Sequence, residues 1–189
     1  MSTLRLRLAT AADADAVADL HAESWRRYYR GAYADEFLDR DVLADRRLAW
    51  RERLREADPR RLTLLAEDRE RAIGFASTYL DDDPVWGSLL DNLHVAAEHQ
   101  RQGIGARLLA LTAEEVTGRR SPAQRGLYLW VLEQNIAAQA FYEALGAEPA
   151  GRERVAPPGG VPGRLAGTPF KLRYAWADAA RLIPRRGAS

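Results

Sequence analysis

The sequence contains no cysteine, and this absence excludes several kinds of chemistry at once. Disulfide bonds, a thiolate nucleophile and a cysteine-ligated metal site are all ruled out. Lysine is almost absent too, since Lys171 is the only one, so the basic side chains are nearly all arginine. No apolar run approaches the roughly 20 residues that span a bilayer, and the first residues carry no apolar secretory segment. These absences predict a soluble cytoplasmic protein without a membrane partner.

The chain also has no excess of positive or negative charge. The chain has 28 Lys and Arg against 27 Asp and Glu, for a formal net charge of +1. Such a balance gives no reason to expect a nucleic-acid partner. A length of 189 residues suits one globular domain, which we place at residues 1–177, followed by a C-terminal tail at 178–189.

The most informative segment runs from Leu93 to Ala106. An apolar strand ends at Val95, a short polar loop follows, and a helix begins beside two glycines, Gly103 and Gly105. Glycine lets a ligand approach the backbone closely, and the first turn of a helix offers unpaired N–H groups at the positive end of its dipole. The segment therefore predicts a site for phosphate or pyrophosphate. Further donors come from the loop side chains Gln100, Arg101 and Gln102.

Two common phosphate motifs do not fit this segment. A P-loop needs a lysine after its second glycine, where this chain has Ala106. A dinucleotide fingerprint needs a third small residue where Leu108 stands, and an acid at the end of a second strand. Glu114 and Glu115 come too early and lie on the same expected helix. A nucleotide-dependent enzyme is therefore disfavoured.

The remaining pattern, Gln-x-x-Gly-x-Gly after an apolar strand, resembles the coenzyme A pyrophosphate loop of the GNAT acetyltransferases. A second segment strengthens the resemblance, because residues Asn135 to Gly146 are similar to the GNAT motif Asn-x-x-Ala-x-x-Phe-Tyr-Glu-x-Leu-Gly. It follows an apolar strand at Leu127 to Leu132, as the family requires. One departure is Ala147, where the family usually has phenylalanine.

The beginning of the chain agrees with that resemblance. Residues 4–8 alternate as a half-buried strand does, and a helix with apolar spacing follows. Residues Glu23 to Leu38 are similar to a GNAT subgroup that reads Glu-Ser-Trp-x-x-x-Tyr-x-Gly and then Asp-Glu-Phe-Leu. The resemblance covers the chain from about Leu4 to Trp176.

The resemblance implies an α/β (α+β) fold with a mixed, mostly antiparallel sheet of six to seven strands and about four flanking helices. It also implies that the strand before the glycine loop splays from its neighbour, so that the pantetheine arm lies in the gap. The residues implied to bind acetyl-CoA or coenzyme A are Leu93, Val95, Gln100, Arg101, Gln102, Gly103, Ile104, Gly105, Ala106, Asn135, Ala138 and Phe141.

The implied reaction is transfer of the acetyl group of acetyl-CoA to a primary amine of a small molecule or peptide, by direct attack in a ternary complex and without a metal. The resemblance makes Tyr142 the general acid that returns a proton to the coenzyme A thiolate. Asp91 matches a position where many GNAT sequences carry an acid. Alternation along the strand predicts that Asp91 and Leu93 share one face, with His94 on the other. An aspartate is far more acidic than an ammonium, so we expect Asp91 to act through water or to bind the ammonium.

The acceptor site is expected at an aromatic group formed by Trp25, Tyr28, Tyr29 and Tyr33, which suits a cationic or apolar amine. His21 lies on the apolar side of the first expected helix and is predicted to be a core residue. A homodimer is an expectation from the family. The alternative function is a non-catalytic coenzyme A-binding sensor module of the same fold.

Three other segments complete the secondary-structure predictions. Residues 35–56 read as a charged helical region with Leu48 on its buried side, and residues 81–84 read as a turn. Residues 149–168, rich in glycine and proline, read as a long, mobile loop between two late strands.

Overall fold

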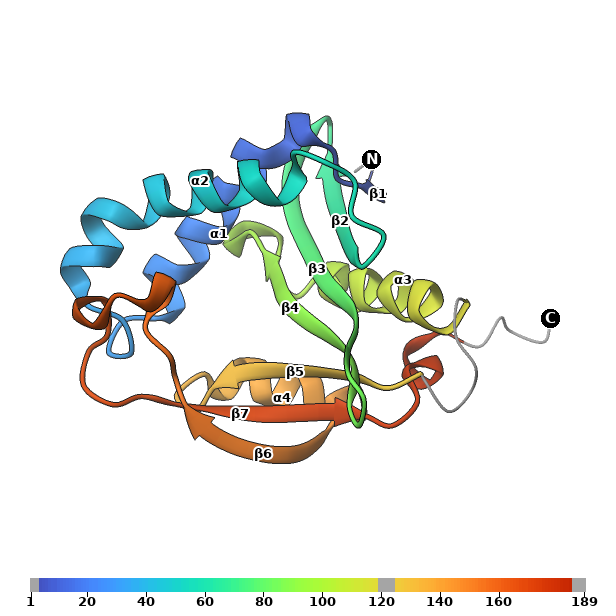
Figure 1. Ribbon diagram of the computed structural model, residues 1–189. Helices are drawn as coiled ribbons and strands as arrows, with labels where there is room; N and C mark the ends of the chain where they lie inside the picture. Colours follow the sequence, from blue (N-terminus) through green and yellow to red (C-terminus); the bar gives the residue numbers. More distant parts are fainter. Residues whose placement is uncertain (1–3, 119–124, 185–189) are drawn as a thin grey trace.

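The computed structural model describes residues 4–118 and 125–184, which form one seven-stranded sheet with helices on both faces (Figure 1). The spatial order of the strands is β1-β2-β3-β4-β5-β7-β6. The pairing of β4 with β5 is parallel, and the other pairings are antiparallel. The strands are β1 (Arg5–Leu8), β2 (Arg61–Asp68), β3 (Arg71–Asp83), β4 (Gly87–Val95), β5 (Leu127–Leu132), β6 (Glu148–Arg154) and β7 (Phe170–Trp176).

Four α-helices flank this sheet, so the predicted fold class is confirmed. They are α1 (Ala14–Tyr28), α2 (Val42–Leu54), α3 (Ile104–Gly118) and α4 (Ile136–Ala144). A short π-helix, η2 (Phe37–Asp41), leads into α2, and a 3-10 turn, η7 (Ala179–Leu182), follows β7. Within the described ranges, no helix combines the length and the apolar character that a membrane span needs.

Alternation along the central strands divides the core into two layers. Phe75 of β3 packs with Val17 of α1 and Trp50 of α2 on one face of the sheet. Its neighbour Ala76 belongs to the larger cluster on the other face, which includes Leu108 of α3. Burial of these apolar side chains on both faces is the main stabilising contribution to the sheet. The segment after β7 joins the larger cluster, since Ala179 is fully buried.

The second motif folds as its sequence predicts. Asn135 is the N-cap of α4, where its Oδ1 accepts a bond of 3.2 Å from the backbone N–H of Ala138. Gly146 follows the helix with φ of +80°, a left-handed conformation that favours glycine at a helix C-terminus. Both ends of the helix are therefore set by the residues that carry the resemblance.

Three predictions about secondary structure were wrong. Residues 149–154, the first part of the expected loop, belong to the edge strand β6 instead, because its polar side chains suit an exposed edge. Leu48 is 75% exposed on α2 and not part of its buried side. The acidic residues 81–83 extend β3, so the turn begins only at Pro84.

The rest of the expected loop is tied to the helical side of the molecule. Leu165 forms an antiparallel bridge with Tyr33, and the backbone N–H of Ala166 donates to the carbonyl of Ala32 at 2.9 Å. The N–H of Ala34 donates to the carbonyl of Arg164. These backbone bonds pair the two segments in the manner of a short sheet, so this part of the chain is held in place.

The feature that positions the site is the separation of β4 from β5. Their pairing covers three positions and stops at Leu90 with Leu129, although β4 continues to Val95 and β5 to Leu132. Figure 1 shows the two strands diverging from this point. The splayed strand expected from the resemblance is present.

Candidate active site

The glycine turn opens α3 as the sequence predicts. Gly103 has φ of +77°, and an added Cβ there would meet no described atom within 4 Å. The first helical bond runs from the N–H of Arg107 to the carbonyl of Gly103, so the N–H groups of residues 104–106 point out of the helix end. Open space, donors and the positive end of the dipole therefore coincide, as an anion site requires. Arg101 and Gln102 are exposed beside this turn.

Residues of both motifs meet at the start of α3. A Cβ added to Gly105 would lie 3.3 Å from Cζ of Phe141 on α4 and 3.9 Å from a methyl group of Val95 on β4. The end of β4, the first turn of α3 and the side of α4 thus come together at a position where glycine is needed for close packing. Ala138 of the same motif packs against this cluster.

Gln100 and Tyr28 connect the glycine loop to α1. The Gln100 amide donates to the Tyr28 hydroxyl at 2.8 Å and to the Val95 carbonyl at 3.1 Å. The Gln100 side chain is therefore engaged within the protein, and the Tyr28 hydroxyl is bonded to the glycine loop. Sequence spacing alone could not separate Tyr28 from Tyr29 in this way.

The predicted face of Asp91 was wrong, because β4 has a bulge at this residue. Thr78 of β3 pairs with Leu90 and the preceding Ser77 pairs with Asn92, so Asp91 is the extra residue. Beyond the bulge, Leu93 packs in the cluster that includes α3. Asp91 instead forms an ion pair of 2.9 Å with Arg53 of α2, on the opposite face.

His94 lies on the same face as Asp91 and is mostly enclosed by α1. Its Nδ1 lies 2.7 Å from Oγ of Ser24, and its ring centre is 4.8 Å from that of His21. Burial lowers the pKa of His94 to about 4, so its imidazole is neutral near pH 7. The prediction that His21 is a core residue is confirmed, since it is 1% exposed and accepts a bond of 2.9 Å from the Trp50 indole.

Tyr142 points from α4 into the larger core cluster. It is 8% exposed, and its ring packs against Phe141 and Trp176 with centroid distances of 5.3 and 6.2 Å. Burial, with a smaller contribution from Tyr29, raises the pKa of Tyr142 above its ordinary value. The phenol therefore keeps its proton throughout the neutral range, as a proton donor must.

Trp25, Tyr29 and Tyr33 form an aromatic cluster beside Asp91. Their ring centres lie 4.9–5.3 Å apart, and Trp25 and Tyr33 are buried. Burial and then the charge of Asp91 raise the pKa of Tyr29 to about 12. The charge of Asp91 acts on Tyr29 and Tyr29 acts on Tyr142, so electrostatic interactions link the aromatic cluster to both residues.

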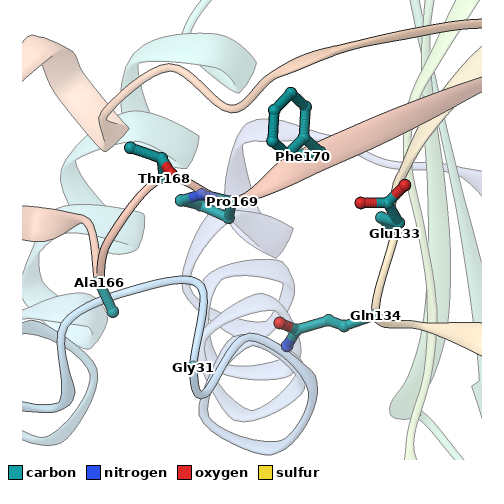
Figure 2. Close-up of a pocket in the computed structure, with 7 residues that line it drawn as sticks. All are labelled: Gly31, Glu133, Gln134, Ala166, Thr168, Pro169 and Phe170. Atoms are coloured by element: carbon teal, nitrogen blue, oxygen red, sulfur yellow. The ribbon is translucent and has the colours of Figure 1, made fainter.

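A cavity whose wall includes Gly31 was not predicted from the sequence. Its volume is about 380 Å³, and Figure 2 shows three loops contributing its walls, with the Gln134 side chain directed toward the Gly31 loop. Gln134 donates to the carbonyl of Arg30 at 2.7 Å, which links the loop after β5 to the end of α1. Walls made of loops carry no periodic pattern that would have revealed them. The lining residues are Gly31, Glu133, Gln134, Ala166, Thr168, Pro169 and Phe170.

Comparison with known proteins gives the same assignment as this geometry. The Acetyltransferase (GNAT) family matches residues 15–147, which is more than half of the chain. The chain belongs to this family. A probable N-acetyltransferase of Mycobacterium tuberculosis is 30% identical over 148 residues, which cover 75% of this chain and 78% of the relative.

Two further similarities agree. An uncharacterized N-acetyltransferase of Bacillus subtilis is 27% identical over 146 residues, covering 76% of this chain and 79% of the relative. The crystal structure of the PaiA N-acetyltransferase of Thermoplasma acidophilum, in complex with coenzyme A, has a TM-score of 0.68. That likeness covers 92% of this chain and 99% of the other at 20% identity, and it therefore concerns the fold.

Proposed function

We propose that this chain transfers the acetyl group of acetyl-CoA to a primary amine by direct attack within a ternary complex. The observation that carries the proposal is the splay of β4 from β5 directly beside the glycine turn of α3. Within this gap, β4 residues 93–95 have no pairing with β5, and α4 brings Tyr142 to its other side. Acetyl-CoA supplies the activated acetyl group as a thioester.

The pyrophosphate fits the first turn of α3, where the backbone N–H groups of residues 104–106 and the exposed Arg101 are donors. Backbone groups of Leu93 and Val95 hold the pantetheine arm and face the thioester oxygen. An N–H group aimed at a developing negative charge contributes about 3–4 kcal/mol to catalysis. Asn135 uses its Oδ1 to cap α4, and its amide N–H₂ group is the part that serves the pantetheine.

Two side chains take part in the proton transfers of the proposed reaction. Asp91 holds the incoming ammonium at the bulge. The ammonium loses its proton to water, because a carboxylate is a weak base. Tyr142 donates its proton to the leaving thiolate, and burial keeps that proton in place until it is needed. His94 is neutral but shielded by α1 and Ser24, so it is a less suitable base than a water molecule held by Asp91.

The acceptor enters from the side of the aromatic cluster. The cavity between the loops lies next to Tyr29 and Tyr33 in the chain, because Gly31 is part of its wall. Because the chain has no cysteine, an acyl-enzyme intermediate on a thiol is excluded, and direct attack by the amine needs no such intermediate.

The test is incubation of the purified protein with acetyl-CoA and a panel of amines, read by mass spectrometry for a gain of one acetyl group. The alternative function, a coenzyme A sensor without turnover, predicts a rise in melting temperature with coenzyme A but no acetylated amine. Acetylation of an amine by the protein, lost in Tyr142→Phe, supports the enzyme.

A further inference from the structure

The face of α2 that lies toward α1 and β4 carries two arginines, one on each side of Trp50. Arg46, Trp50 and Arg53 are separated by four and three residues, which places them on one side of the helix. The guanidinium of Arg46 lies 4.3 Å from the ring centre of Trp25, and Arg53 forms the ion pair with Asp91. Both arginines therefore border the region assigned to the acceptor.

The surroundings of Arg46 have one positive charge in excess. Arg46 donates to Asp45 from Nε at 3.0 Å and from Nη2, and Arg164 donates to the other oxygen of Asp45 at 2.7 Å. Two guanidinium groups thus share one carboxylate, and no other acid in residues 4–118 and 125–184 forms an ion pair with either. The side chains are only 12%, 25% and 18% exposed for Arg46, Arg164 and Asp45. Charges removed from water in this way favour a compensating anion.

Asp91 has one carboxylate oxygen that is bonded within the protein and one that is not. Arg53 and the amide of Asn92 both donate to its Oδ2. Among the described residues no hydrogen bond reaches Oδ1, so this oxygen remains available to an ammonium. The Nη1 atom of Arg46 is likewise without a partner within the described ranges. The region therefore offers one acceptor for a cation and one donor for an anion.

We propose that the acceptor amine also carries a carboxylate, as an amino acid does, and that Arg46 binds this carboxylate while Asp91 binds the ammonium. The proposal rests on the proposed acetyl transfer and specifies its substrate class. The Arg46 guanidinium lies over the Trp25 ring with Nε and Nη2 bonded to Asp45, so Nη1 is left to donate a charge-assisted hydrogen bond to a carboxylate. The same charge opposes a polycationic amine, so the aromatic cluster alone is a misleading guide to the substrate.

The electrostatics of the aromatic cluster support the position of Arg46. Burial and the charge of Asp91 raise the pKa of Tyr29, whereas the charge of Arg46 acts in the opposite direction. For Tyr33, burial and Tyr29 raise the pKa, and Arg46 again opposes the rise. The charges of Arg46 and Asp91 therefore act on the same two tyrosines with opposite sign.

The experiment compares matched acceptors: the common amino acids, their carboxamides, the corresponding decarboxylated amines, and spermidine as a polycation. Acetyl transfer is followed by mass spectrometry and kcat/KM is measured for the best set. We expect the free amino acid to exceed its carboxamide by at least about tenfold, the size of one charge-assisted hydrogen bond. Arg46→Met should bring this ratio close to one, and Arg46→Lys should keep part of it.

Arg47→Met is the matched control, because Arg47 is next to Arg46 in the chain but donates to Asp19 at 2.9 Å on the exposed side of α1. This variant should keep the ratio of the unmodified protein. Thermal melting of each variant separates loss of folding from loss of selectivity. Equal or faster turnover of the carboxamide or of spermidine overturns the carboxylate assignment and leaves the acetyl transfer standing.

If no amine in the panel is acetylated, the proposed function fails, and the carboxylate preference is read from binding. The melting temperature of the protein with coenzyme A is then measured with each matched acceptor. A larger rise with the amino acid than with its carboxamide, lost in Arg46→Met, supports the site. Equal shifts for the two molecules overturn it.

Discussion

The Nη1 atom of Arg53 lies 2.9 Å from Oδ2 of Asp91, and this contact joins α2 to the bulge in β4. The pair holds the carboxylate at the place where β4 leaves β5. A helix on one face of the sheet therefore fixes the orientation of the acid at the candidate active site.

Replacing this carboxylate should affect the amine and spare the coenzyme. We expect Asp91→Asn to lower kcat/KM for the acceptor by about tenfold or more, the value of a hydrogen bond to a charged group. The rise in melting temperature caused by coenzyme A should stay unchanged, because Asp91 precedes the strand residues assigned to the pantetheine. Asp15→Asn is the control, since its ion pair with Arg51 is exposed. Unaltered kinetics in Asp91→Asn would remove this residue from the mechanism.

Tyr142→Phe should reduce turnover strongly while acetyl-CoA binds as before. The substitution keeps the packing against Trp176 but removes the proton donor, and general acid–base catalysis is typically worth about 10²–10⁴-fold. Steady-state kinetics and thermal shift with coenzyme A measure the two effects separately. Tyr174→Phe serves as the control, because that hydroxyl is bonded to Glu143 at 2.6 Å and takes no part in the proposed reaction. A loss of less than about threefold in Tyr142→Phe would make the tyrosine a contact residue only.

Gly103→Val should abolish the rise in melting temperature caused by coenzyme A. The positive φ of Gly103 is unsuitable for a β-branched residue, so the free protein should also lose roughly 1–3 kcal/mol of stability. Gly103→Asn separates the two effects, since asparagine tolerates a positive φ but still places a side chain where the ligand lies. Differential scanning fluorimetry with and without coenzyme A gives both quantities. Retention of the full shift in both variants would disprove the loop assignment.

Acid should destabilise the fold through its buried histidines before its carboxylates titrate. Burial lowers the pKa of His94 to about 4, below its unfolded value near 6.5. The stability from the neutral imidazole is complete above pH 6.5 and is lost as the pH falls from 6.5 towards 4, because only the unfolded chain binds the proton there. His21 acts in the same direction, since burial also lowers its pKa.

Urea unfolding at pH 7, 6 and 5 measures this dependence. His94→Gln should make the dependence of stability on pH less steep, because glutamine does not titrate. Part of the dependence should remain, because His21 still contributes. The pH profile of kcat/KM provides an independent check, since a neutral His94 gives no limb near pH 6.5. A limb at that pH which disappears in His94→Gln would transfer the role of base to this histidine.

The sequence allowed the fold and the local structure around the glycine turn and α4 to be predicted well. Glycines and helix ends leave local signals, so the turn at Gly103, the cap at Asn135 and the start of α3 were all found in place. These features depend on the conformational preferences of a few neighbouring residues, so they can be predicted without knowledge of the tertiary packing.

The surroundings of Asp91 were predicted less well, for physical reasons. A bulge is a property of two paired strands, so the alternation of β4 alone could not reveal that Asp91 changes face. Arg46 lay in a run of alternating charges on α2, and only packing distinguishes it from the exposed Arg47. Long-range contacts between loops set the cavity near Gly31, and no short-range pattern encodes them.

The bulge in β4 also means that the sheet can do without the residue that bears the acid. Leu90 and Asn92 already occupy consecutive pairing positions opposite Thr78 and Ser77, with Asp91 inserted between them. A chain lacking Asp91 could therefore form a regular ladder from Leu89 to Val95 with each remaining side chain on its present face. The residue at the bulge can therefore change without altering the pairing of its neighbours. Leu90 and Asn92 keep their packing positions, and the side chain at position 91 does not have to fill a regular strand position.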